Sequence, residues 1–310
     1  MKRIDASAPG KLMVSGEYAV LDGAVAIVAS ADVRVRVRWV DEPATLPPEA
    51  AATRELAERE LGVVEGALTL DASDLRKAGK KLGLGSSAAA SAAVAGALLA
   101  THGHDLTDPV VQQRAFKLAL AGHKAIAPEG SGADVAAASL GGFVRFRLSG
   151  GSAEATRVEF PEQVQSRVVW TGKEARTSEF VRAVRAFEAR DGEGFFKLRG
   201  ELHDQALRFA DAIQRSEISE IISATAAYGQ TMGELGRAAG VPIVTDELAQ
   251  IAVLAGEHGG AAKPSGAGGG DVAIAFFPSA QSAQAFDDAC RAAKLDLLDL
   301  RLGAAGVRAE

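Results

Sequence analysis

The feature that most constrains this chain is an uncharged run from Leu82 to Thr101, which opens with glycines and serines and continues mainly with alanine. Alanine favours the helix, and a helix without charged residues must be buried on all its faces to be stable in water. The run is too weakly hydrophobic for a convincing membrane span. We therefore expect a buried helix enclosed by other layers of a globular fold.

Patterns along the rest of the chain indicate two α+β domains rather than a doubly wound parallel sheet. Strands and helices come first, helical stretches dominate residues 177–258, and a strand, a helix and a last strand at 295–302 close the chain. The 310 residues correspond to about two domains, which we place at 1–162 and 163–310. Residues 33–39 alternate between apolar residues and arginine, which predicts a strand with its arginines on a solvated face.

Composition narrows the choice of partners. The chain has 34 basic and 40 acidic residues and a net charge of −6, which argues against sequence-independent binding to nucleic acid. Cys290 is the single cysteine, so neither an intrachain disulfide nor a cysteine-rich metal cage can form. The N-terminal residues lack the apolar core of a signal peptide. We expect a cytoplasmic protein with a small-molecule partner and no membrane partner.

The turn before the uncharged helix has the composition of a phosphate-binding loop. Gly83 and Gly85 precede Ser86 and Ser87. The amides of a first helical turn lack partners and attract anions, and glycines let the backbone approach a phosphate closely. The spacing differs from both the P-loop and the dinucleotide-binding fingerprint. Two interpretations remain open here: a phosphate-binding turn, or an ordinary serine-capped helix after a glycine turn.

Three further segments carry chemistry-bearing residues. Ser7–Lys11, followed by Gly16–Tyr18, places a lysine after a Pro-Gly pair at a strand edge. Gly130–Asp134 places a carboxylate at a helix start between glycines, and Lys263–Asp271 is glycine-rich before an apolar strand. Each has an ordinary alternative: a turn with an exposed lysine, a helix start that favours aspartate, and a flexible hairpin loop.

Taken together, the four segments are far more specific. SAPGKLMVSGEYAV, KLGLGSSAAA, GSGADVAAASLGG and KPSGAGGGD occur in this order, and over residues 7–277 the sequence resembles the GHMP kinase family of galactokinase, homoserine kinase, mevalonate kinase and phosphomevalonate kinase. The resemblance implies an N-terminal GHMP kinase domain that binds ATP and has a left-handed crossover. It also implies a ferredoxin-like C-terminal GHMP kinase domain, with the active site between the two.

Several details resemble the phosphomevalonate kinases within that family. Lys81 stands two residues before Gly83, and Trp170–Gly172 followed by Ala175–Thr177 resembles the WTG-x-x-A-x-T segment of those enzymes. His123 stands eleven residues before the motif aspartate, where mevalonate kinases have a glutamate that binds magnesium. An imidazole is a poor substitute for a carboxylate on Mg²⁺. His123 therefore argues against a plain mevalonate kinase, and a helix-end histidine satisfied by a backbone carbonyl is the alternative interpretation.

The resemblance implies transfer of the γ-phosphoryl of Mg-ATP to (R)-5-phosphomevalonate. An alcohol acceptor needs a base, whereas a phosphate monoester is already mostly ionised at pH 7 and needs cations and in-line positioning. The alternatives are a mevalonate kinase that phosphorylates the 5-hydroxyl, a diphosphomevalonate decarboxylase, and a non-catalytic ligand-binding protein of the same fold. Either a monomer or a homodimer fits the sequence.

By the same resemblance, site roles can be assigned residue by residue. The catalytic residues would be Lys11, Lys81 and Asp134, with Asp134 acting as a base or as an orienting group. The ATP phosphates would lie against Gly83, Leu84, Gly85, Ser86, Ser87 and Ala88, with Ser87 also touching Mg²⁺. The acceptor would contact Lys11, Tyr18, Ser131, Gly132, Arg176, Ser265, Gly266, Ala267 and Gly268. Lys80 and Lys263 would be reserve cations.

Overall fold

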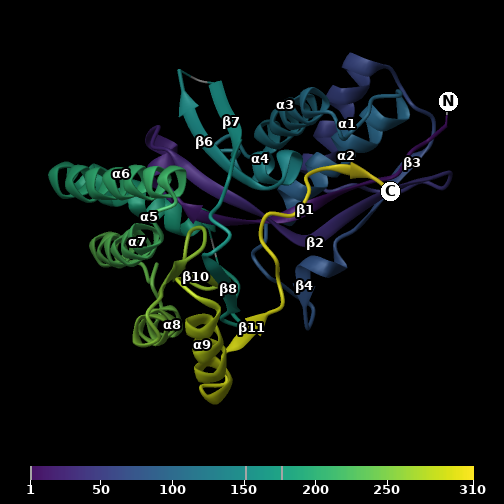
Figure 1. Cartoon of the computed structure of the whole chain (residues 1–310). Helices are drawn as coiled ribbons and strands as arrows, with labels where there is room; N and C mark the ends of the chain where they lie inside the picture. Colours follow the sequence, from purple (N-terminus) through teal and green to yellow (C-terminus); the bar gives the residue numbers. More distant parts are fainter. Residues whose placement is uncertain (1, 151, 176) are drawn as a thin grey trace.

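A six-stranded antiparallel sheet is built mainly from the N-terminal part of the chain. The structure is a computed structural model that describes residues 2–150, 152–175 and 177–310. The strand order is β12-β1-β2-β6-β7, and β3 pairs with β2 away from this path (Figure 1). The strands are β1 (Ala6–Ser15), β2 (Ala26–Val40), β3 (Ala67–Asp71), β6 (Phe143–Ser149), β7 (Ser152–Val158) and β12 (Arg308–Ala309).

Four helices cover one side of this sheet (Figure 1). They are α1 (Pro48–Leu61), α2 (Ser86–Thr101), α3 (Pro109–Ile126) and α4 (Ala133–Leu140). Helices α2 and α4 pack on the strands, and α1 and α3 pack on α2. The predicted buried helix is confirmed as α2, in which every residue from Ala88 to Leu99 is buried. Small side chains let its neighbours approach: a Cβ added to Gly96 would lie 2.3 Å from Cγ2 of Val307.

The second sheet has the strand order β11-β8-β10-β9, which is the order of a ferredoxin-like fold. Its strands are β8 (Gln165–Trp170), β9 (Ala261–Pro264), β10 (Val272–Phe277) and β11 (Asp296–Leu298). Its helices are α5 (Thr177–Arg190), α6 (Gly192–Arg215), α7 (Ile218–Ala239), α8 (Asp246–Glu257) and α9 (Ala280–Ala292). The predicted α+β class is therefore confirmed.

Strand β10 is apolar along its whole length because both of its faces are buried. Val272, Ile274 and Phe276 belong to the core cluster shared with the first sheet. The alternate residues, with Phe277 the largest, pack under α8 and α9. Because both faces are covered, the strand has no polar side.

A short hairpin links the two parts of the molecule. It consists of β4 (Arg76–Lys77) and β5 (Lys80–Lys81), after the 3₁₀ turn η2 (Ser73–Leu75). Lys77 Nζ lies 2.6 Å from Asp296 Oδ1, and Lys80 Nζ donates to the Gly172 carbonyl at 3.0 Å. These groups are exposed, so each contact contributes little to stability.

The predicted last strand at 295–302 is wrong beyond Leu298. The chain leaves the second sheet there and crosses to the first sheet, where the Gly303 amide donates to the Ser30 carbonyl at 2.8 Å. It then reaches β12, the strand that pairs with β1. The boundary between 162 and 163 stays a prediction, and the segment after Leu298 lies against the first sheet.

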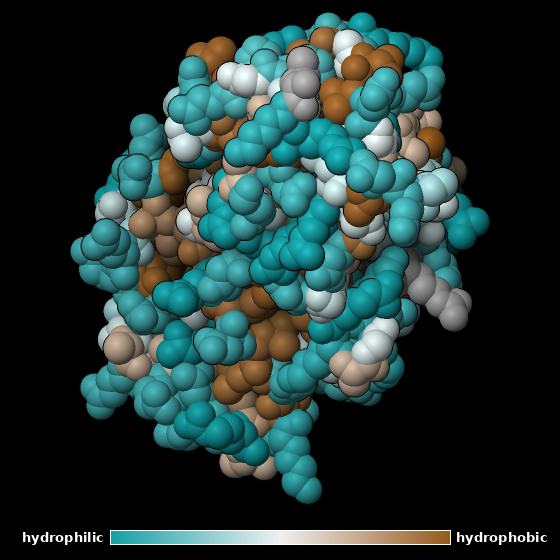
Figure 2. Space-filling view, turned by 90° about the vertical axis from the view of Figure 1, so that its right-hand side faces the viewer, coloured by the Kyte–Doolittle hydropathy of each residue, from teal (hydrophilic) through white to brown (hydrophobic). Residues whose placement is uncertain are grey.

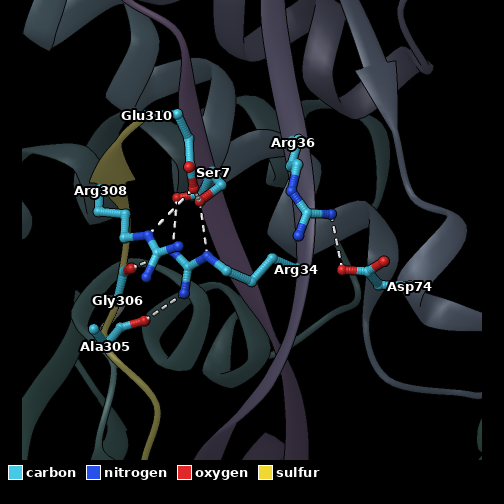
Figure 3. A network of polar contacts seen from close by, with 8 residues as sticks. All are labelled: Ser7, Arg34, Arg36, Asp74, Ala305, Gly306, Arg308 and Glu310. Carbon is cyan, nitrogen blue, oxygen red and sulfur yellow. Dashed lines mark hydrogen bonds and ion pairs between the residues drawn. The ribbon is translucent and has the colours of Figure 1, made fainter.

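A buried arginine fixes this returning segment, as Figure 3 shows. The Arg34 guanidinium donates to the carbonyls of Ala305 at 2.9 Å and Gly306 at 2.7 Å, and to Ser7 Oγ at 2.7 Å. Burial lowers the pKa of Arg34 to about 10. The expectation of a wholly solvated arginine face is therefore wrong at Arg34, because the C-terminal segment covers it.

No helix in the described part of the chain is long and apolar enough to cross a membrane. Figure 2 shows one face of the molecule, on which hydrophilic side chains predominate and apolar side chains gather in smaller patches.

Candidate active site

Residues from three of the sequence segments line one cavity of about 190 Å³. They come from β1 and the turn after it, from the loop before α4, and from the glycine-rich loop between β9 and β10. The sequence-predicted residues in this lining are Lys11, Tyr18, Ser131, Asp134, Gly266 and Ala267. The fold thus brings together side chains up to about 250 positions apart, which local sequence can suggest but not place.

Lys11 connects this cavity to the glycine-serine turn. Its amide donates to the Leu84 carbonyl at 2.9 Å. A Cβ added to Gly85 would lie 2.7 Å from Cγ of Lys11, and Gly85 has a φ of 73°. Only glycine fits both the left-handed backbone and the lysine stem that lies on it. The side chain of Lys11 therefore runs along the glycine-serine turn and lines the cavity.

The start of α2 distinguishes the two interpretations of this turn. Gly85 is the N-cap, and it makes no side-chain capping hydrogen bond. Ser86 and Ser87 lie inside the first turn instead. The serine-capped interpretation is therefore wrong, and the amides of this turn keep the geometry that favours an anion.

Asp134 lies in the first turn of α4. Gly132 is the N-cap of this helix with a φ of 87°, and Ser131 Oγ accepts a hydrogen bond from the Ala133 amide at 3.2 Å. Asp134 Oδ1 accepts from the Val135 amide at 3.0 Å. The carboxylate is half-buried and lines the cavity on the same wall as Ser131.

A buried ion pair joins Glu17, which lines the cavity, to Lys263 of β9. Lys263 Nζ contacts Glu17 Oε1, and the two side chains are 1% and 2% exposed. Burial lowers the pKa of Lys263, and the Glu17 carboxylate opposes that shift. Tyr228 donates to the Glu17 carbonyl at 2.7 Å. Lys263 is thus committed to joining the two domains, which conflicts with a role as a reserve cation.

Two predicted acceptor contacts belong to the same junction. Tyr18 donates its hydroxyl to the Ala267 carbonyl, and Ser265 Oγ donates to the Met13 carbonyl at 2.9 Å. Burial, and then the neighbouring Glu17 charge, raise the pKa of Tyr18. Its hydroxyl is therefore neutral at physiological pH.

Asp271 is a site residue to which the sequence assigned no role. A Cβ added to Gly83 would lie 2.4 Å from Cγ of Asp271, and Asp271 Oδ1 accepts from the Ala175 amide at 3.0 Å. Burial raises the pKa of Asp271, while the Ala175 amide and then the Lys11 charge lower it. Its φ of 49° is strained for a non-glycine residue. Asp271 therefore connects the glycine-serine turn at 83–87, called the phosphate turn below, to the 171–175 segment.

Some predicted residues lie elsewhere. Lys81 and Lys80 are exposed on the β4–β5 hairpin, where the Lys81 amide donates to Glu174 Oε1 at 2.7 Å. A Cβ added to Gly268 would lie 2.2 Å from the Ile243 carbonyl oxygen, so this glycine serves close packing. Arg176 lies outside the described residues.

Other residues of the cavity were missed or left without a role. They are Glu17, His123, Glu129 and Thr177. Glu17 and Thr177 stand inside segments that the sequence had singled out, and His123 was noted only as a departure from mevalonate kinases. Glu129 adjoins the Gly130–Asp134 segment, and that adjacency was the only signal for it.

The magnesium ligands available from the protein are few. In the described part of the chain, no group of three or more His, Cys, Asp or Glu side chains could hold a metal ion. Ser87 supplies a hydroxyl in the first turn of α2, and Asp134 supplies a carboxylate in the cavity lining. That sparse oxygen set fits an ion such as Mg²⁺, which is commonly bound through one or two protein oxygens and substrate phosphates.

Family models match both parts of the chain. The model described as the GHMP kinases N terminal domain matches residues 52–142, and the model for the GHMP kinases C terminal matches residues 226–295. Together they cover about half of the sequence and include the phosphate turn, Asp134 and the last glycine-rich segment. The chain belongs to the GHMP kinase family.

Three relatives show which members of the GHMP kinase family this chain is similar to. A phosphomevalonate kinase from Streptomyces sp. (strain CL190) is 26% identical over 340 residues, covering 89% of this chain and 90% of the relative. A mevalonate kinase from Aeropyrum pernix is 32% identical over 169 residues, covering 46% and 50% of the two chains. The Streptococcus pneumoniae phosphomevalonate kinase in complex with phosphomevalonate and AMPPNP has a TM-score of 0.81 and 22% identity, over 96% of this chain and 99% of that one.

Proposed function

We propose that this protein is an ATP-dependent phosphomevalonate kinase. It would transfer the γ-phosphoryl of ATP to a phosphate oxygen of (R)-5-phosphomevalonate, giving 5-diphosphomevalonate and ADP. The observation that carries the proposal is the placement of Lys11, whose stem lies on Gly85 of the phosphate turn while its side chain lines the cavity. One cation can therefore reach both reactants. The Streptomyces phosphomevalonate kinase, similar over nearly the whole chain, supports the same substrate.

The chemistry of the acceptor fits these residues. A phosphate monoester has a second pKa of about 6, so at pH 7 its oxygen is already a nucleophile and needs no base. The main obstacle is repulsion between two anionic phosphate groups, which a cation and correct alignment reduce. Lys11 supplies the cation, and the amides at the start of α2 hold the nucleotide phosphates. Asp134 orients Lys11 or the acceptor.

Magnesium would reach this site with the nucleotide. Ser87 and Asp134 are the residues that would hold it, and its chemical contribution is to offset charge on the phosphate oxygens. The protein's own part is to fix the phosphates against the start of α2 and to hold the cavity lining together through the Tyr18–Ala267 hydrogen bond.

The mevalonate kinase alternative rests on the half-length similarity to the Aeropyrum enzyme. In that case the acceptor is an alcohol, and Asp134 must accept its proton as a general base. The two proposals therefore assign different roles to the Asp134 carboxylate, and the substitution Asp134→Asn distinguishes them.

The test is the release of ADP by the purified protein with Mg-ATP and either 5-phosphomevalonate or mevalonate. We expect turnover with the phosphorylated acceptor and little with mevalonate. Asp134→Asn should then retain measurable turnover, because asparagine keeps an oxygen that can orient the acceptor and reach Mg²⁺ and loses only the ability to accept a proton. Turnover with mevalonate alone, abolished by Asp134→Asn, would establish the alternative and overturn our proposal.

The compartment and assembly belong to the same proposal. We infer that the protein acts in the cytoplasm as a monomer or homodimer. A single cysteine, Cys290, which is buried, suits a reducing compartment.

A further inference from the structure

His123 lies in the last turn of α3 and lines the cavity, and the residues that the structure describes do not complete the hydrogen bonds of its ring. The residue is 7% exposed. Nδ1 is buried and has no partner among the residues that the structure describes. Nε2 lies 3.5 Å from Ser87 Oγ, at the outer limit of a hydrogen bond. Buried polar atoms without partners are rare in folded proteins, and each one calls for an explanation.

The backbone around His123 is held firmly. A Cβ added to Gly122 would lie 2.1 Å from Thr53 Oγ1, so α3 packs directly on α1 at this turn. The His123 carbonyl accepts from the Ala127 amide at 2.9 Å, which ends the helix. The ring therefore lies between the first turn of α2 and the Gly130 loop because of helix packing.

The contact between Ser87 and Nε2 leaves Nδ1 as the ring nitrogen that can bond to a ligand. When Ser87 donates its hydroxyl to Nε2, the proton of the imidazole is on Nδ1, which becomes a donor. The cavity lining holds Lys11 beside the carboxylates of Glu17, Glu129 and Asp134, of which Glu17 is paired with Lys263. The contact with Ser87 places the first turn of α2, whose amides favour anions, next to the ring. The ionised phosphate oxygens of an anionic ligand accept hydrogen bonds. A ligand in this cavity thus favours the form with the proton on Nδ1.

We propose that His123 is a specificity-determining residue whose Nδ1–H donates to a phosphoryl oxygen of a bound reactant. The inference rests on the proposed function and names the chemistry that completes the site. Either the phosphate of the acceptor or the γ-phosphate of the nucleotide can supply that oxygen. In both cases Ser87 is left with its oxygen lone pairs free, because its proton points to Nε2.

Two substitutions separate the ring nitrogens. In His123→Asn the amide nitrogen can occupy roughly the position of Nδ1, whereas in His123→Gln it can occupy roughly that of Nε2. Dissociation constants are measured by calorimetry for 5-phosphomevalonate alone and for Mg-AMP-PNP alone. We expect His123→Asn to bind both within about threefold of the parent. His123→Gln should weaken one of them by at least about tenfold, as for a lost hydrogen bond to a charged group.

The matched control is His102, which ends α2 outside the cavity and contacts the Leu98 carbonyl through Nδ1 at 2.8 Å. His102→Asn and His102→Gln should leave both dissociation constants unchanged. Equal losses in His123→Asn and His123→Gln, or no loss in either, would overturn the inference. The ligand whose affinity falls in His123→Gln identifies the source of the oxygen.

Nitrogen-15 NMR of histidine-labelled parent protein gives a second measurement, which needs no substitution. We expect the His123 ring to carry its proton on Nδ1 when the identified ligand is bound; a proton on Nε2 would overturn the inference.

The outcomes also separate this inference from the proposed function. If the parent fails to turn over 5-phosphomevalonate but the two variants still differ in binding Mg-AMP-PNP, the proposed function fails and this inference stands. If the parent turns it over and the variants bind alike, the inference alone fails.

Discussion

Lys263→Met will leave the Glu17 carboxylate buried without its partner. Both side chains are almost completely inaccessible, at 1% and 2% exposure, so solvent cannot replace the lost ammonium. Nζ also donates to the Pro264 carbonyl at 2.9 Å, and that bond is lost too. Methionine matches the length of the stem, which keeps the packing change small.

The magnitude follows from this burial. Removing one partner of a buried ion pair costs about 3–5 kcal/mol. For a chain of this size, about 2 °C of melting temperature corresponds to 1 kcal/mol, so we expect a fall of roughly 6–10 °C. In the double variant Glu17→Gln/Lys263→Met no charge is stranded, and we expect about 2 kcal/mol of the loss to be recovered.

The assay is urea unfolding followed by circular dichroism, with melting curves as a second probe. The control is Lys173→Met, which breaks the exposed pair between Lys173 and Glu247, whose side chains are 56% and 33% exposed. We expect that change to cost no more than about 0.5 kcal/mol, because surface ion pairs contribute little. A loss under about 1 kcal/mol in Lys263→Met, or an equal loss in the control, would refute the reasoning.

Three further predictions concern the turn, the cation and the thiol. Lys11→Met should lower kcat by about a hundredfold or more while changing the affinity for Mg-AMP-PNP far less; steady-state kinetics and calorimetry would show whether both fall together instead. Gly83→Ala should abolish nucleotide binding by calorimetry, because its Cβ would overlap Asp271; near-parental affinity would contradict the close approach. Burial raises the pKa of Cys290 to about 11, so at pH 8 the thiol should react with a disulfide reagent only after unfolding; prompt reaction in the native protein would exclude this.

Elements with strong local patterns were predictable. The uncharged run became α2, and the apolar run Val272–Phe277 became β10. The helical stretches predicted for residues 177–258 are confirmed as α5 to α8. In each case the signal lies within the element, in its periodicity or its lack of charge, so no distant residue is needed to recognise it.

Burial by segments that are distant in the sequence was not predictable. Arg34 belongs to an alternating strand that predicts a solvated side chain, yet it is 6% exposed beneath residues 305 and 306. The end of β11 at Leu298 has the same cause, because the following residues leave their sheet to cover another. Nothing near either position in the sequence announces a partner some 270 residues away.

The candidate site also combines residues that local motifs predict with pairings that only tertiary packing determines. Lys11, Ser131, Asp134 and Gly266 were named from motifs, and the structure places them around one cavity. Lys263 carries the charge expected of a phosphate-binding lysine, but Glu17 neutralises it, and only tertiary packing reveals that pairing. Two other groups depend on burial in the same way: His123 Nδ1 is buried without a partner in the described part of the chain, and burial raises the pKa of Asp271.

The most direct test of the account is phosphorus-31 NMR of the products formed from Mg-ATP and 5-phosphomevalonate. Our account predicts that the monoester resonance of the acceptor is replaced by the two coupled resonances of a diphosphate, together with ADP. An unchanged monoester signal, with product formed only when mevalonate is supplied, would contradict the claim that a phosphate oxygen is the acceptor at this site.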